Sequence, residues 1–167
     1  MAESDPVLSK AKAWRVAYGE HVRWVREQAR LETELVQRVG FPGIDVKVPG
    51  KPTPAFVQDA ATLQLLLGKG AAAKKAEGDL RAALKAWKAE AARSGYSDAK
   101  QREKETGLVA ERLAHEALTT KARTIEGAIA KLDIVLEVEA PGPDVTEAPW
   151  PALRLITADL RRLVKSK

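Results

Sequence analysis

The chain has 167 residues, the size of one domain with a sizeable core, and a formal net charge of +5. Its 45% hydrophobic and 31% charged residues exclude an intrinsically disordered protein. The absence of cysteine excludes disulfides, thiolate metal sites and cysteine nucleophiles, and no apolar run approaches the roughly 18 residues of a membrane span. We therefore expect a cytoplasmic protein that does not enter a membrane.

A long helix is predicted over residues 6–39. Asp5 is a typical N-cap, and Pro6 suits the first helical position. Apolar residues then recur at spacings of three and four from Ala11 to Ala29 and define one buried face. Gly40 is a common type of helix terminator, so the helix is expected to end before it.

Residues 40–53 form a segment rich in proline and glycine, which excludes a regular helix. Ile44, Val46 and Val48 alternate with polar residues, so a short strand is an alternative to an ordered loop. No second strand is evident to pair with this segment, and we therefore predict a loop.

Residues 54–118 are predicted to form a short helix followed by a helical hairpin. Thr53 and Pro54 repeat the cap-plus-proline signal, which indicates a helix over residues 54–67. The following Gly68-Lys69-Gly70 lacks the spacing of a phosphate-binding loop. We interpret it as a hinge between two helices.

The hairpin is predicted from two helices, one from Ala71 and one from Asp98, with Ser97 as the N-cap of the second. The buried face of the first helix is expected to hold Leu80, Leu84, Trp87 and Ala91. A turn of four residues around Gly95 makes the two helices antiparallel. We expect its tip to protrude from the core or to meet a partner.

Residues 119–167 are predicted to form a C-terminal helical pair. Thr124 caps a helix that is apolar almost all round, which marks a buried central helix. Glycine costs about 1 kcal/mol relative to alanine inside a helix, so we expect the close approach of a neighbouring helix at Gly127. Trp150 is expected to pack at the start of the last helix. The buried face of that helix is predicted to hold Leu153, Ile156, Leu160 and Leu163.

These elements predict an all-α fold in a single helical domain over residues 1–167. The expected architecture is a five- to six-helix bundle with a long N-terminal helix and a protruding antiparallel helical hairpin.

The second half of the chain also carries a set of short helical signatures. They are Ala86-Trp87, Glu116-Ala117-Leu118, Thr124-Ile125-Glu126-Gly127, Ala130-Lys131, Trp150-Pro151 and Asp159-Leu160. With these signatures, residues 80–163 resemble uncharacterised small α-helical proteins of alphaproteobacteria, some of which are prophage-associated. The resemblance implies an all-α fold and no assigned activity.

The two histidines and the carboxylates give little support to catalysis. Glu111 and His115 are four residues apart on a predicted helix, a spacing that suits two metal ligands, but a site needs further ligands from elsewhere. We interpret the pair as an exposed ion pair, and His21 as a residue at the border of the first apolar face. Asp133 is interpreted as the partner in an interhelical salt bridge or as part of its helix's polar edge. The sequence therefore predicts no catalytic residue, no metal and no cofactor.

The positive charge is unevenly distributed. Residues 151–167 hold five basic residues and one acidic residue, an excess that the dipole of a helix C-terminus explains. A second group lies on the helix that begins at Ala71. Four of its members partly share one face and the fifth borders that face: Lys74, Arg81, Lys85, Lys88 and, at the border, Lys75.

Broad apolar patterning without a catalytic motif leads to a hypothesis about function. We interpret the chain as a non-catalytic interaction or assembly protein, phage-related, with a protein partner or self-association. The alternative is a nucleic-acid-binding protein that uses the basic helical face.

Overall fold

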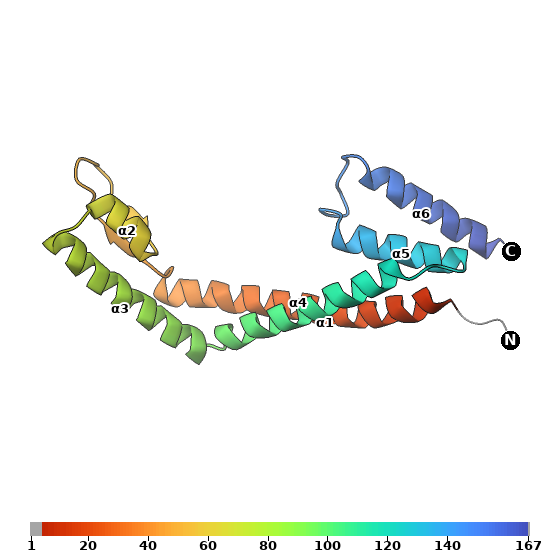
Figure 1. The fold of residues 1–167 in the computed structure, drawn as a ribbon, viewed down its shortest axis with the longest axis horizontal. Coiled ribbons are helices and arrows are strands. Elements are labelled where there is room, and N and C mark those ends of the chain that lie inside the picture. Colours follow the sequence, from red (N-terminus) through yellow and green to blue (C-terminus); the bar gives the residue numbers. More distant parts are fainter. Residues whose placement is uncertain (1–4, 167) are drawn as a thin grey trace. The chain divides into compact units, whose positions relative to one another are not determined.

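The computed structural model describes residues 5–166 and shows a protein built mainly of helices (Figure 1). Six α-helices and two short strands follow in the order α1 Pro6–Val39, β1 Ile44–Val46, β2 Ala55–Val57, α2 Ala60–Leu67, α3 Ala71–Arg93, α4 Tyr96–Thr119, α5 Ile125–Val138 and α6 Trp150–Lys165. The all-α fold and the long N-terminal helix are confirmed. None of the helices within residues 5–166 is both long and apolar enough to cross a membrane.

Contacts divide the chain into two compact units. The first unit holds the chain up to Trp24 and from Glu103 onward, and the second is Val25–Arg102. The second unit has fourteen basic and nine acidic residues, whereas the first has fourteen of each. The whole net charge of +5 therefore belongs to the second unit.

The core of the first unit forms where α1, α4 and α5 meet. Its buried members are Val7, Ala11 and Trp14 of α1, Ala114 and Ala117 of α4, and Ala130 and Ile134 of α5. The alanines allow these helices to approach closely around one large indole ring, as close packing requires. After the connection 139–149, α6 runs back along α5 (Figure 1).

The start of α1 is joined to the start of α5 by one buried carboxylate, Asp5, which is 2% exposed. Its Oδ1 accepts the N–H of Val7 at 2.9 Å, the N-cap bond predicted from the sequence. Its Oδ2 accepts the N–H of Arg123 at 2.7 Å and the N–H and hydroxyl of Thr124 at 2.8 and 2.9 Å. Burial by itself would raise the pKa of Asp5, but these hydrogen bonds outweigh it and lower the pKa to about 2.

Thr124 and Gly127 complete this joint. The Thr124 side chain accepts the Gly127 N–H at 3.0 Å, so the predicted N-cap of α5 is confirmed. A Cβ on Gly127 would lie 2.2 Å from Oδ2 of Asp5. The predicted close approach therefore exists, but a capping carboxylate makes it and not the body of a neighbouring helix.

The second unit contains a small sheet that corrects two predictions. β1 pairs with β2 in antiparallel register, with Ile44 opposite Val57 and Val46 opposite Ala55. The segment predicted as a loop therefore holds a strand, and residues 55–57 are its partner strand rather than the first turn of a helix. The helix begins later because Asp59, not Thr53, is its N-cap: Asp59 Oδ1 accepts the Thr62 N–H at 2.8 Å.

The sheet helps to form the main core of the second unit. Val46 and Val57 of the sheet pack with Leu63 of α2 and Leu80 of α3. The Gly68–Gly70 segment separates α2 from α3, so the predicted hinge position is confirmed.

The turn between α3 and α4 is packed on one side rather than free. Gly95 adopts a φ of 81°, and α4 begins at Tyr96, so Ser97 lies inside the helix and is not its N-cap. Tyr96 is 4% exposed, packs against Leu35 of α1, and meets the ring of Trp87 edge-on at 5.5 Å. An aromatic side chain at the tip therefore anchors the turn to its own unit.

The buried face of α6 differs in part from the predicted one. Thr157 is 1% exposed, and Leu153 and Leu160 are half-buried. Ile156 and Leu163, predicted to be buried, are 50% and 57% exposed. The helix is thus rotated relative to the predicted face, and Trp150 is half-buried at its start as expected.

Candidate functional site

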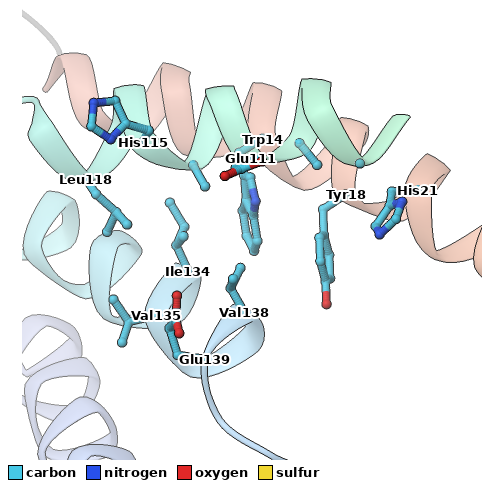
Figure 2. Close-up of a pocket in the computed structure, with 13 residues that line it drawn as sticks. Trp14, Tyr18, His21, Glu111, His115, Leu118, Ile134, Val135, Val138 and Glu139 are labelled. Carbon is cyan, nitrogen blue, oxygen red and sulfur yellow. The ribbon is translucent and has the colours of Figure 1, made fainter. Parts of the chain in front are cut away.

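A cavity of about 390 Å³ lies within the first unit, bounded by α1, α4 and α5 (Figure 2). Its lining residues are Trp14, Tyr18 and His21 of α1, Gly107, Ala110, Glu111, Ala114, His115 and Leu118 of α4, and Ile134, Val135, Val138 and Glu139 at α5. This volume falls in the range of small-molecule pockets in proteins, which are mostly apolar and carry a few polar groups.

The α1 wall is a row of aromatic rings. Trp14, Tyr18 and His21 are four and three residues apart, so successive turns of the helix place them on one face. Trp14 and Tyr18 stack with ring centroids 5.1 Å apart and an interplanar angle of 24°. Tyr18 and His21 follow at 6.4 Å and 53°. Figure 2 shows the three rings side by side along α1, with Trp14 and Tyr18 reaching toward α5.

Three of the α4 residues that line the cavity are small. Gly107, Ala110 and Ala114 recur at spacings of three and four on the cavity side. A Cβ on Gly107 would lie 3.1 Å from Cε1 of His21, so the glycine lets the imidazole lie directly on the helix. The small side chains let the α1 rings pack closely on α4, and the residues of α5 complete the wall of the cavity.

The α5 wall is aliphatic and is held in place by Tyr18. Ile134, Val135 and Val138 supply the apolar surface. The Tyr18 hydroxyl donates to the Glu137 carbonyl at 3.4 Å and so ties α1 to the C-terminal turn of α5. Burial raises the pKa of Tyr18, and the Glu137 carboxylate adds to the rise, so the phenol stays protonated and remains a donor.

Two polar atoms distinguish this cavity from ordinary core packing. His21 Nδ1 lies 3.2 Å from the Glu103 carbonyl oxygen, and because a carbonyl oxygen only accepts, this hydrogen bond requires the proton on Nδ1. Trp14 is 2% exposed, and its indole N–H has no hydrogen-bond partner among the described residues. An unsatisfied buried donor of this kind costs about 1–3 kcal/mol, so it calls for an acceptor.

The Glu111 and His115 pair lies at the rim of this cavity, and both side chains are exposed. Within residues 5–166 no group of three or more histidine, aspartate and glutamate side chains is arranged to hold a metal ion. The rim therefore contributes charge and hydrogen-bonding groups to the cavity.

Asp133 does not line the cavity. Its carboxylate forms ion pairs with Arg161 of α6 and, at 4.0 Å, with Arg15 of α1. The interhelical salt bridge that we considered for this residue is thus present, and it explains a carboxylate in a largely apolar helix without invoking acid–base chemistry.

The predicted basic face lies on α3 in the second unit. At 3.6 residues per turn, Lys74, Arg81, Lys85 and Lys88 fall within an arc of about 60°, and all four are exposed. None of them makes an ion pair within the described part of the chain. Lys75 lies at the border and pairs with Asp79 at 2.9 Å.

No family model, curated protein or solved structure matches this chain. The resemblance to alphaproteobacterial helical proteins therefore stays a prediction, and any functional proposal depends on the geometry of the chain itself.

Sequence reasoning did not find the cavity. It treated Trp14 and Tyr18 as members of a buried stripe and His21 as a residue at its edge. The available signal was a row of aromatic residues in one helix together with a row of Gly107, Ala110 and Ala114 in another. What the sequence did not reveal is that these two rows face each other.

Proposed function

We propose that the protein is a non-catalytic, cytoplasmic interaction or assembly protein, and that it self-associates through the exposed edge of α6. The observation that carries this proposal is the exposure of three large apolar side chains on one helix. Leu155, Ile156 and Leu163 are 68%, 50% and 57% exposed, while the other side of α6 is covered in its own unit. An apolar helix edge of this kind is typical of a surface that binds another chain.

The charges beside this edge favour a second copy of the same chain in antiparallel orientation. Ile156 and Leu163 are seven residues apart and share a face. Two antiparallel copies of α6 can be related by a two-fold axis that passes midway between these two residues. Ile156 of one copy then contacts Leu163 of the other, as a self-complementary interface requires. Asp159 and Arg162, which pair at 2.9 Å within one chain, then face their opposite charges across the interface. An assembly role also agrees with the prophage association implied by the resemblance.

Light scattering across a wide concentration range tests this proposal. We expect a dimer at high concentration that dissociates on dilution. The double substitution Ile156→Lys and Leu163→Lys should give a monomer with unchanged helix content, because both side chains are already solvent-exposed. Val16→Lys, at a residue that is 72% exposed on α1, is the matched control and should still dimerise. A wild-type chain that stays monomeric at every concentration would refute self-association.

The basic face of α3 supports nucleic-acid binding as the second candidate. Lys74 to Lys88 covers about 21 Å along the helix, and its unit carries the whole excess of positive charge. If the four basic residues each contact one phosphate, the affinity falls as the salt concentration rises. In a plot of the logarithm of affinity against the logarithm of salt concentration, we expect a downward slope of about 3 to 4. Fluorescence anisotropy with duplex DNA measures this slope. Lys85→Ala should reduce the magnitude of this slope by about one. If the protein does not bind DNA at low salt, the nucleic-acid hypothesis is wrong.

A further inference from the structure

We propose that the cavity between α1, α4 and α5 binds a neutral, mostly apolar small molecule that carries a hydrogen-bond acceptor for the Trp14 indole N–H. This proposal is independent of self-association, because it concerns a site inside the first unit and not the exposed edge of α6.

The size and walls of the cavity favour a molecule of about two fused rings. A volume of about 390 Å³ exceeds what one or two waters occupy and falls among small-molecule sites. The surface consists mainly of the Trp14 and Tyr18 rings, the small side chains of α4 and the aliphatic side chains of α5. Burial of apolar surface is therefore the main source of affinity.

The orphan donor specifies the polar group of the ligand. The Trp14 nitrogen is shielded from bulk water and has no partner among the described residues. Although carboxylates and imidazoles also line the cavity, none of them forms a hydrogen bond with the indole N–H. A ketone, ester or ether oxygen brought in by a ligand satisfies this donor, which an all-carbon molecule of the same shape leaves unpaired.

The charges at the rim decide the sign of the ligand. Glu111 and Glu139 both line the cavity, and both side chains are exposed at its opening. An anionic ligand would meet two carboxylates and would leave its own charge in an apolar space. The site therefore favours a neutral molecule over a carboxylate of the same shape.

Three probes of one shape test these steps in the full-length protein. They are 2-acetonaphthone, the alkene isostere 2-isopropenylnaphthalene, and the anion 2-naphthoate. The readout is the indole N–H resonance of Trp14 in a ¹⁵N-labelled sample, assigned with Trp14→Phe. The ketone should shift the Trp14 N–H resonance saturably and further downfield than the alkene does, because a hydrogen bond deshields the proton. The alkene and the anion should each bind roughly tenfold more weakly than the ketone.

Internal and matched controls make the result specific. The Trp87 indole N–H is also buried and unpartnered but does not line this cavity, so its resonance should not move. Val138→Phe fills the cavity from a residue that is 46% exposed, and it should abolish binding, whereas Leu108→Phe, at a 58% exposed residue outside the cavity, should leave it unchanged. In Trp14→Phe, where the reporting resonance is gone and binding is measured by calorimetry instead, the ketone and the alkene should bind equally.

Three results would overturn the proposal. The first is the absence of any saturable shift of the Trp14 resonance with the ketone. The second is an equal shift at Trp87, which would show non-specific adsorption to buried indoles. The third is unchanged ketone binding in Val138→Phe, which would place the ligand elsewhere. Because Val138 is at the rim, its variant keeps the test valid even if Trp14→Phe fails to fold.

Discussion

Substitution of Gly127 by alanine is expected to destabilise the protein, although alanine is the better helix former. A Cβ at this position would lie 2.2 Å from Oδ2 and 2.7 Å from Cγ of Asp5. Ordinary van der Waals contact begins near 3.4 Å, so the carboxylate must move by about 1 Å. That movement breaks its short hydrogen bonds to Arg123 and Thr124, at 2.7 to 2.9 Å.

The size of this destabilisation depends on two opposing effects, the loss of hydrogen bonds and the gain in helix propensity. Hydrogen bonds to a charged group contribute about 1.5–3 kcal/mol each, and the two backbone N–H groups freed by the movement lose their acceptor. The gain in helix propensity is about 1 kcal/mol. We therefore expect Gly127→Ala to lower the free energy of unfolding by about 2–5 kcal/mol, measured by urea denaturation with circular dichroism.

A double-mutant cycle distinguishes this cause from a general intolerance of α5 to substitution. Asp5→Ala removes the three atoms that would lie nearest to the new Cβ. In that background Gly127→Ala should become stabilising by up to about 1 kcal/mol, a reversal of sign that reports the coupling of the two residues. Gly19→Ala is the matched control, because a Cβ there meets nothing within 4 Å, and it should stabilise the native chain. If Gly127→Ala stabilises the wild-type chain as Gly19→Ala does, the close approach does not exist.

Two further outcomes follow from the same joint and from the second unit. Because the pKa of Asp5 is lowered from 3.8 to about 2, its ionised form stabilises the fold fully above about pH 4 and this contribution is lost as the pH falls toward 2. Denaturation across this range should show a shallower loss of stability in Asp5→Asn, and an equally steep loss would contradict the assigned hydrogen bonds. Leu63→Ala, at a residue with 0% exposure, should cost about 2–5 kcal/mol, whereas Leu65→Ala, at 86% exposure, should change stability by less than about 0.5 kcal/mol. Similar losses in both variants, measured by urea denaturation, would contradict the packing of α2.

Helix boundaries were predictable where a local residue determines them. Asp5 caps α1 and Thr124 caps α5 through hydrogen bonds to groups within three residues, so both starts are visible in the sequence. The terminating Gly40 and Gly95 adopt positive φ angles of 75° and 81°, which local composition also indicates. These signals depend on neighbours along the chain and need no knowledge of the tertiary structure.

The remaining features depend on contacts between distant residues. β2 is only three residues long, too short for a periodic pattern, and it is a strand because Ala55 pairs with Val46 across nine positions. Asp5 also accepts hydrogen bonds from Arg123 and Thr124, which are 118 and 119 positions further along the chain. No local sequence signal indicates these bonds. The cavity likewise arises because one face of α1 lies opposite the small residues of α4. Sequence periodicity identifies each face but not its partner.

The rotated face of α6 gives a last prediction, because it shows why periodicity selected the wrong residue. Apolar spacing favoured Ile156 as buried, yet Thr157 is the residue at 1% exposure. Its hydroxyl donates to the Leu153 carbonyl at 2.7 Å, one turn back in the same helix, so a polar residue is buried without needing an acceptor elsewhere.

Thr157→Val removes this hydroxyl without leaving a polar group unsatisfied, because the Leu153 carbonyl keeps its helical hydrogen bond. We expect the free energy of unfolding either to stay the same or to rise by up to about 1 kcal/mol. Ile156→Thr, at a 50% exposed position and measured at a dilution where the chain is monomeric, should cost less than about 1 kcal/mol. The opposite order, with Thr157→Val destabilising and Ile156→Thr costing more, would restore the face predicted from the sequence. It would also remove the exposed edge on which self-association depends, so this pair of variants tests the geometry of α6 before any partner is sought.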